Sequence, residues 1–174
     1  MLRWVQSTEP VEARTHRYEE IAADAVRVAY DEAEAPLFPG PLGREKTAAL
    51  LISIASYESA FSADVDRGIT IGGGGEAYCL MQVQPGPGIV LEDDAYTYSP
   101  RGLHGPDLTR DRTQCFRVAM HILRVSITKC SKLPSEDRLS AYTTGRCMVG
   151  ETKGRWRWKR AERAWTAIRA EAGG

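Results

Sequence analysis

The sequence predicts a mostly α-helical domain with one small β-rich segment, an α+β class, from three observations. Apolar residues recur every three to four positions around residues 18–29, 47–58, 116–127 and 158–168, which is the spacing that gives a helix one apolar face. Residues 64–90 are instead rich in glycine and contain short β-forming pieces. The chain of 174 residues is long enough for one domain that buries most of its apolar surface. No repeat or second core suggests another domain.

Residues 1–40 are expected to form an N-terminal helix and a proline-rich connector that pack on the rest of the domain, residues 41–174. Tyr18, Ile21 and Val28 follow helical spacing, with acidic residues on the other face. Prolines in residues 36–41 then interrupt the helical pattern. This segment is therefore predicted to be a rigid connector.

The second helical stretch ends at Glu58, which follows an unusually apolar run. Leu51, Ile54 and Ala55 precede Glu58 by seven, four and three positions, so all four side chains lie on one helical face. A carboxyl group on such a face loses solvation, which favours its protonated form. A protonated carboxyl group near neutral pH is suited to general acid catalysis. Glu58 is thus the first candidate catalytic residue.

The glycine-rich segment 64–90 is predicted to be a loop or small β-ribbon beside a cleft, because glycine lets the backbone approach a ligand closely. Its four consecutive glycines, 72–75, are not followed by the Lys-Ser/Thr pair of a phosphate-binding loop. Residues 89–110 contain scattered proline and glycine and are predicted to be irregular.

Two further helices are predicted after this excursion. The helix containing residues 116–127 has Asp111 or Thr113 as its N-terminal cap. A shorter helix is expected to begin after Pro134, with Ser135 as its cap, and to run into Tyr142.

The last helix places Trp158 and Trp165 on one stripe, where they are expected to pack in the core. Residues 101–174 carry 16 basic and 7 acidic side chains although the whole chain has net charge zero. Most of these charges are expected to form a solvated surface. A basic face that binds a polyanion is the alternative, and a cell-wall polymer is preferred over nucleic acid because no nucleic-acid motif accompanies the charge.

The four cysteines show no zinc-ligand spacing, so no metal site is expected. They allow one or two disulfides in an oxidising compartment, and Cys130–Cys147 is the preferred pair, since these two flank a short segment. Four buried thiols are the alternative. The sequence also shows no apolar run long enough to cross a membrane and no visible signal peptide.

Three short segments, in order, are similar to signatures of the lysozyme-like lytic transglycosylase (SLT) superfamily. They are Glu58-Ser59-x-Phe61, Leu80-Met81-Gln82-Val83 and Ala141-Tyr142-x-x-Gly145. The resemblance covers roughly residues 45–170 and implies a lysozyme-like helical domain with a small β-rich flap beside a glycan-binding groove. The sequence departs from the family at Cys79, where glycine is usual, and at Thr143-Thr144, where asparagine is usual after the tyrosine.

The resemblance implies cleavage of peptidoglycan glycan strands without a cofactor. Glu58 would protonate the oxygen between N-acetylmuramic acid and N-acetylglucosamine and then act as base, so that a 1,6-anhydro ring closes. Tyr142 would orient the Glu58 carboxyl group. Ser59 would hydrogen-bond near the acid or the glycan, and Met81 and Gln82 would line the groove. Each of these three residues, like Tyr142, also has a purely structural interpretation.

Two alternatives remain at this level. The spacing from Glu58 to Met81 is closer to that of goose-type lysozymes, and Asp64, Asp66 or Glu76 in this loop would then activate water in a hydrolase, an inverting muramidase. If they have no catalytic role, these three carboxylates are expected to be exposed charges of the loop. The second alternative is a non-catalytic cell-wall-binding or structural module.

The implied substrate lies outside the cytoplasm. The chain is therefore expected to act in the periplasm or cell wall. A phage or virion-associated lysin, a cargo of a secretion or injection apparatus and a trimmed periplasmic protein all fit this expectation.

Overall fold

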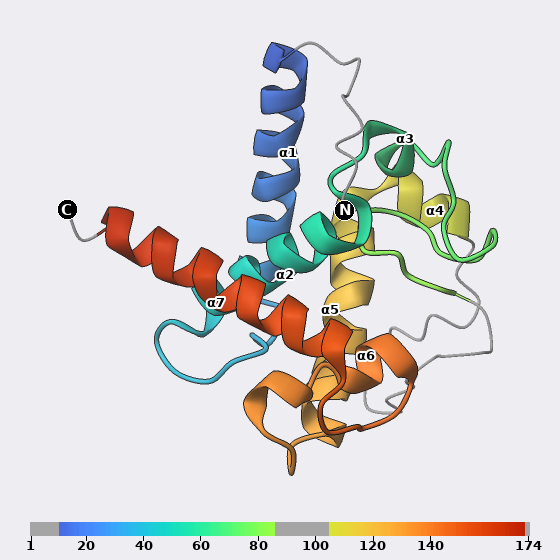
Figure 1. Ribbon diagram of the computed structural model, residues 1–174. Helices are drawn as coiled ribbons and strands as arrows, with labels where there is room; N and C mark the ends of the chain where they lie inside the picture. Colours follow the sequence, from blue (N-terminus) through green and yellow to red (C-terminus); the bar gives the residue numbers. More distant parts are fainter. Residues whose placement is uncertain (1–10, 86–104, 173–174) are drawn as a thin grey trace.

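The computed structural model describes residues 11–85 and 105–172, with side chains up to residue 167, and it is mostly helical as predicted (Figure 1). The long helices are α1 (Val11–Tyr30), α2 (Gly43–Ser59), α5 (Arg112–Lys129) and α7 (Thr152–Ala172). The short ones are α3 (Ala63–Asp66), α4 (Gly105–Arg110), the 3₁₀ helix η1 (Ser135–Asp137) and α6 (Ser140–Thr144). No helix in these two ranges is both long and apolar enough to cross a membrane.

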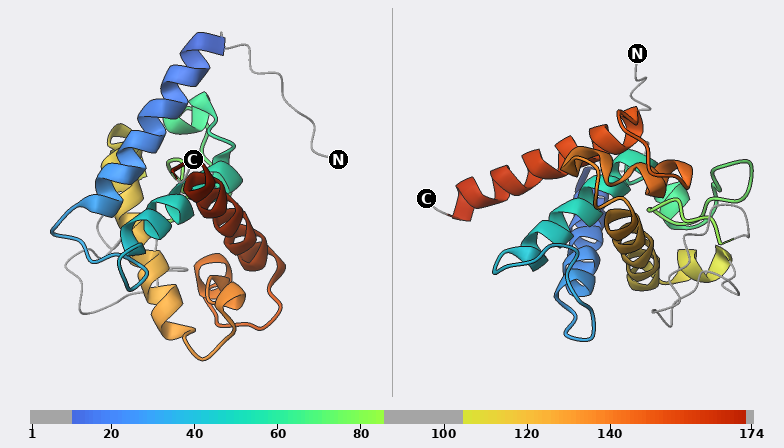
Figure 2. Two further views of the ribbon diagram at one scale, coloured as in Figure 1. Left: turned by 90° about the vertical axis from the view of Figure 1, so that its left-hand side faces the viewer. Right: turned by 90° about the horizontal axis from the view of Figure 1, so that it is seen from below.

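Helix α2 is the central element of the fold. It packs against α1 on one side and α7 on the other, and α1 also packs on α5 (Figures 1 and 2). Leu50, Leu51 and Ile54 are fully buried in the core between these helices. The α2 stretch is apolar on most of its circumference because it has neighbours on several sides.

The connector between α1 and α2 is fixed by side chains of α2. Arg44 donates hydrogen bonds to the carbonyl oxygens of Ala29 (2.8 Å) and Asp31 (2.9 Å), and the Leu37 N–H donates to Thr47 Oγ1 (2.9 Å). Gly43 is required at the start of α2, because a Cβ atom there would lie 2.1 Å from the Phe38 carbonyl oxygen. These hydrogen bonds connect the segment to α2, which suits a rigid connector.

The glycine-rich segment forms two isolated antiparallel bridges, Gly72 to Ala77 and Tyr78 to Val83. Among the β-forming pieces expected in this segment, residues 80–83 contribute Val83 to a bridge, whereas residues 69–71 take part in neither bridge. The prediction that residues 89–110 are irregular is wrong at its end, since α4 begins at Gly105. Residues 86–104 lie outside the described residues.

The C-terminal half follows the predicted order with one correction. Asp111 is the N-terminal cap of α5, and its carboxylate accepts a hydrogen bond from the Gln114 N–H (3.1 Å). The single helix predicted from Ser135 to Tyr142 is wrong, because η1 and α6 are separate elements. The buried carboxylate of Asp137, the last residue of η1, receives two hydrogen bonds from Arg155 (2.6 and 2.8 Å), and this long-range ion pair is invisible to local sequence patterns.

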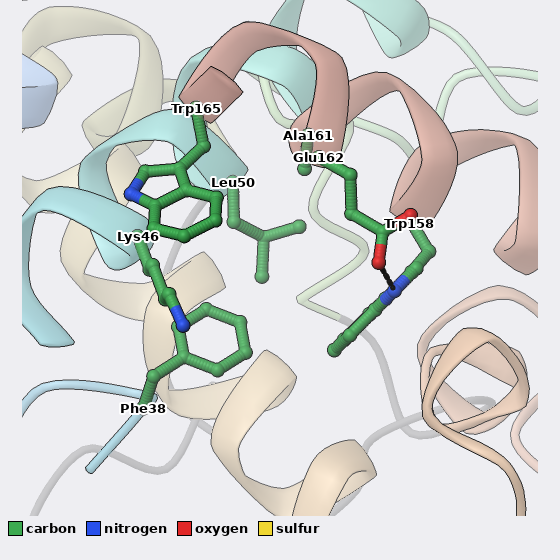
Figure 3. Close-up of a pocket in the computed structure, with 7 residues that line it drawn as sticks. All are labelled: Phe38, Lys46, Leu50, Trp158, Ala161, Glu162 and Trp165. Atoms are coloured by element: carbon green, nitrogen blue, oxygen red, sulfur yellow. Dashed lines mark hydrogen bonds between the residues drawn. The ribbon is translucent and has the colours of Figure 1, made fainter. Parts of the chain in front are cut away.

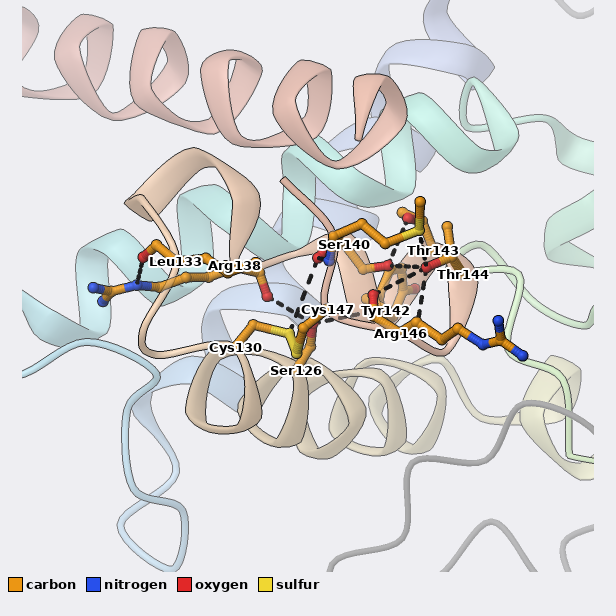
Figure 4. The surroundings of a disulfide bond; sticks show 11 residues. Ser126, Cys130, Leu133, Arg138, Ser140, Tyr142, Thr143, Thr144, Arg146 and Cys147 are labelled. Atoms are coloured by element: carbon orange, nitrogen blue, oxygen red, sulfur yellow. Dashed lines mark hydrogen bonds between the residues drawn. A yellow bond between two sulfur atoms is a disulfide. The ribbon is translucent and has the colours of Figure 1, made fainter. Parts of the chain in front are cut away.

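Both disulfides attach a loop region to α5. Cys130 and Cys147, the preferred pair, are bonded to each other beside α6 (Figure 4). The second disulfide joins Cys79 in the glycine-rich segment to Cys115. The alternative of four free thiols is therefore wrong for this structure.

Candidate active site around Glu58

Glu58 lies in the last turn of α2, where the helix leaves the core. Its side chain is 15% exposed, while Leu51, Ile54 and Ala55 on the same face are fully buried. Ser59 is also buried, and its hydroxyl donates to the Ala55 carbonyl oxygen (2.7 Å). The structure therefore gives Ser59 a backbone-bonding role at the helix end.

The carboxylate of Glu58 is paired with Arg157 of α7, which sequence analysis missed. Arg157 Nε lies 2.6 Å from Glu58 Oε1, and Nη2 of the same guanidinium donates to the same oxygen. The Arg157 side chain is only 6% exposed and its guanidinium stacks 4.5 Å from the centre of the Tyr57 ring. Charge-assisted hydrogen bonds of this kind are among the strong ones. The surroundings of the Glu58 carboxylate therefore include a buried cation as well as the apolar face of α2.

The Arg157 Nη1 atom is buried and has no hydrogen-bond partner among the described residues. A pattern in the sequence could have identified this arginine. It lies three positions after Gly154 and four before Ala161, and both of these are buried on the inner face of α7. A cation on an apolar helical stripe requires a buried partner.

Tyr142 connects the segment 141–145 to the segment 80–83. Its hydroxyl donates to the Met81 carbonyl oxygen (2.9 Å), and its backbone N–H donates to Ser126 Oγ (3.0 Å). Burial and then the nearby Glu58 charge raise the pKa of Tyr142, so the hydroxyl stays protonated. Tyr142 therefore lies within electrostatic reach of Glu58, while its hydrogen bond goes to Met81 and not to the carboxylate.

Met81 and Gln82 occupy the turn that faces Tyr142. The Met81 side chain is fully buried and fills the core. The Gln82 amide donates to the Cys79 carbonyl oxygen (3.1 Å) and packs against Gly72, where an added Cβ atom would lie 1.8 Å from Gln82 Oε1. These contacts give both residues a structural role in the turn.

The three loop carboxylates have different surroundings. Asp66 is buried and forms a two-fold ion pair with Arg112 of α5 (2.8 and 2.9 Å). The Asp66 hydrogen bond is the first cause of the raised pKa of Arg112. Asp64 and Glu76 are exposed, and Asp64 lies 3.7 Å from Arg67. Among the described contacts, none links these three carboxylates to Glu58 or Arg157.

Non-glycine residues with positive φ lie in the segments that contain Glu58 and Met81. Within the described residues, the non-glycine residues with positive φ are Ala60 (50°), Phe61 (53°), Cys79 (57°) and Gln82 (50°). The first two directly follow Glu58-Ser59, and the other two flank Leu80-Met81. Cys79 thus adopts a left-handed conformation that glycine favours. Strained backbone of this kind occurs preferentially at functional sites.

A second glutamate, Glu151, flanks Arg157 at the start of α7. Its carboxylate accepts hydrogen bonds from Thr143 Oγ1 (2.9 Å) and from the backbone N–H of Lys153 (3.0 Å) and of Gly154. Burial is the largest single effect and raises the pKa of Glu151, but the hydrogen bonds from the Gly154 N–H, the Thr143 hydroxyl and the Lys153 N–H, together with the Arg157 charge, lower it below its ordinary value. Thr143 therefore connects α6 to α7 through this helix-capping carboxylate.

The described residues contain no cluster of three or more histidine, cysteine or acidic side chains placed to hold a metal ion. Comparison of the chain with protein-family models, with curated proteins and with solved structures found no match.

Proposed function

We propose that this protein cleaves peptidoglycan glycan strands as a lytic transglycosylase, with Glu58 as the single acid and base. The observation that carries the proposal is the convergence of three segments that are far apart in the sequence. The Tyr142 hydroxyl donates a hydrogen bond to the Met81 carbonyl oxygen, and the nearby Glu58 charge, after burial, raises the pKa of Tyr142. Strained backbone follows Glu58 and flanks Met81, which adds independent support.

The proposal includes a lysozyme-like arrangement of the domain. Helix α2 would be the central helix that carries the acid at its C-terminal end, and residues 63–85 would form the flap beside a glycan-binding groove. The burial of α2 and the two bridges of the glycine-rich segment support this assignment.

In the proposed first step, Glu58 gives its proton to the oxygen between N-acetylmuramic acid and N-acetylglucosamine, and the bond from that oxygen to C1 breaks. In the second step, the Glu58 carboxylate takes the proton of the C6 hydroxyl, whose oxygen bonds to C1. Glu58 ends the second step protonated, as it began the first, so every proton is accounted for. Arg157 would stabilise the carboxylate that exists between them, since its N–H groups reach Glu58 Oε1.

A hydrolase that uses a second carboxylate is less well supported. Asp66 is committed to Arg112, and Asp64 and Glu76 are exposed in the loop. A single carboxylate is sufficient for transglycosylation because the C6 hydroxyl replaces water. The two disulfides also suit an oxidising compartment such as the periplasm or cell wall, where the substrate lies.

The test is digestion of purified cell wall by wild type, Glu58→Gln and the matched control Glu76→Gln, with mass analysis of the products. We expect anhydro products from wild type and from Glu76→Gln, and a loss of rate of about 10²-fold or more for Glu58→Gln. Products with a reducing end and no anhydro mass would establish hydrolysis instead. Equal activity of Glu58→Gln and wild type would refute the role of Glu58, and an inactive wild type would indicate a binding module.

A further inference from the structure

A second feature of the α2–α7 interface is a pocket of about 120 Å³, which we call the aromatic pocket. Its walls are formed by Phe38, Trp158 and Trp165, its floor by Leu50, and its rim by Lys46 and Glu162 (Figure 3). The two tryptophans were expected to be core residues; Trp158 does pack against the core, but both side chains are partly exposed. Partly exposed aromatic side chains gathered around an open pocket are typical of a binding site.

Charged groups hold both indole rings in place. The Trp158 Nε1–H donates to Glu162 Oε1 (2.9 Å), and Lys46 Nζ lies 4.4 Å from the centre of the Trp165 ring. Phe38 meets Trp158 edge-on, with ring centres 5.8 Å apart. Figure 3 shows Trp165 and Phe38 on one side of the pocket and Trp158 on the other. The pocket therefore presents aromatic surface in a fixed arrangement, with one cation and one anion at its rim.

We propose that the aromatic pocket binds one N-acetylhexosamine ring of a glycan strand, at a distance from the bond that is cleaved. The apolar C–H face of a pyranose ring matches an indole or phenyl face. The Lys46 ammonium can donate to a hydroxyl or acetamido oxygen, and Glu162 can accept from a hydroxyl or amide N–H. The opposite charges of Lys46 and Glu162 balance, which favours a neutral sugar over an anionic group.

The position of the pocket fits a polymeric substrate, and in this respect the inference rests on the proposed function. Helices α2 and α7 run antiparallel, since Arg157 pairs with Glu58 at one end and Lys46 meets Trp165 at the other. Leu50 precedes Glu58 by eight positions, which corresponds to about 12 Å along α2. Lys46 lies about 18 Å from Glu58 by the same measure. A strand held at Glu58 can extend to such a site.

The test is the binding of the neutral oligosaccharide chitotetraose, measured by calorimetry in the Glu58→Gln background so that no cleavage occurs. We expect Trp165→Ala to raise Kd at least about tenfold, and Trp165→Phe, which keeps an aromatic face, to raise it less. The matched control is Trp156→Ala, because Trp156 is also on α7 but is 55% exposed and does not line the pocket. It should leave Kd unchanged.

Lys46→Met removes the rim ammonium while every aromatic residue is kept, and it provides a second measurement if Trp165→Ala lowers Tm more than Trp156→Ala does. It should weaken chitotetraose binding by removing the rim donor. The inference is overturned if chitotetraose does not bind, or if the pocket variants bind as tightly as Trp156→Ala. Either result leaves wall cleavage by wild type intact. Wall cleavage by Glu58→Gln at the wild-type rate would instead overturn the proposed function, whatever the pocket binds.

Discussion

Replacement of Arg157 by methionine should be one of the most destabilising single changes in this protein. Removal of one partner from a buried ion pair costs about 3–5 kcal/mol, because the remaining charge is left without compensation. Glu58 is 15% exposed and so keeps some contact with water, which places the expected cost near 3 kcal/mol. Methionine should retain much of the contact that the arginine makes with the Tyr57 ring.

A double-mutant cycle isolates the pair. Glu58→Gln keeps an acceptor for Arg157 but leaves the Arg157 charge, whose side chain is 6% exposed, without a counter-charge, so it should cost about 2 kcal/mol. The double variant leaves no buried charge and should also cost about 2 kcal/mol, less than the two single variants together, which gives a coupling energy of about 3 kcal/mol.

The assay for this cycle is urea unfolding, with an unchanged m-value as evidence that the two-state transition is preserved. Arg160→Met is the control, since Arg160 is exposed and donates to Ser56 Oγ (2.8 Å) on the same pair of helices. It should change the free energy of unfolding by about 0.5 kcal/mol or less. Additive costs for Arg157→Met and Glu58→Gln would refute the ion pair described above.

Two further predictions concern the elements that hold the site. Replacing both cysteines by alanine should cost about 3 kcal/mol for the Cys130–Cys147 disulfide and about 4 kcal/mol for Cys79–Cys115, because their sequence separations are 17 and 36 residues. Urea unfolding of the two double variants measures this, and an equal or inverted order would contradict the loop-closure argument. The Arg155 hydrogen bonds, with a smaller contribution from the Gly150 N–H, lower the pKa of Asp137 below its ordinary 3.8. The resulting stabilisation is present above pH 3.8 and is lost as the pH falls through the lower folded pKa. The Tm of wild type should therefore fall more than the Tm of Asp137→Asn between pH 5 and pH 2. Equal falls in Tm would show that Asp137 is not the source of the pH dependence.

The sequence by itself determined the local features of this protein. The long helices follow from apolar spacing, and the Asp111 cap follows from the position of an acidic side chain just before such a pattern. Glu58 was recognisable because a carboxylate among Leu51, Ile54 and Ala55 is visible within a single helix. All of these signals depend on residues no more than two helical turns apart.

Only the tertiary structure decided what these residues contact. Arg157 lies 99 positions from Glu58, and Arg112 lies 46 positions from Asp66, so no helical or strand periodicity relates the members of either pair. The exposure of Trp165 was also undetermined, because a helical stripe gives the direction of a side chain and not whether another element covers it. Buried charges need compensation, but a sequence pattern cannot name the partner when folding brings it from another helix.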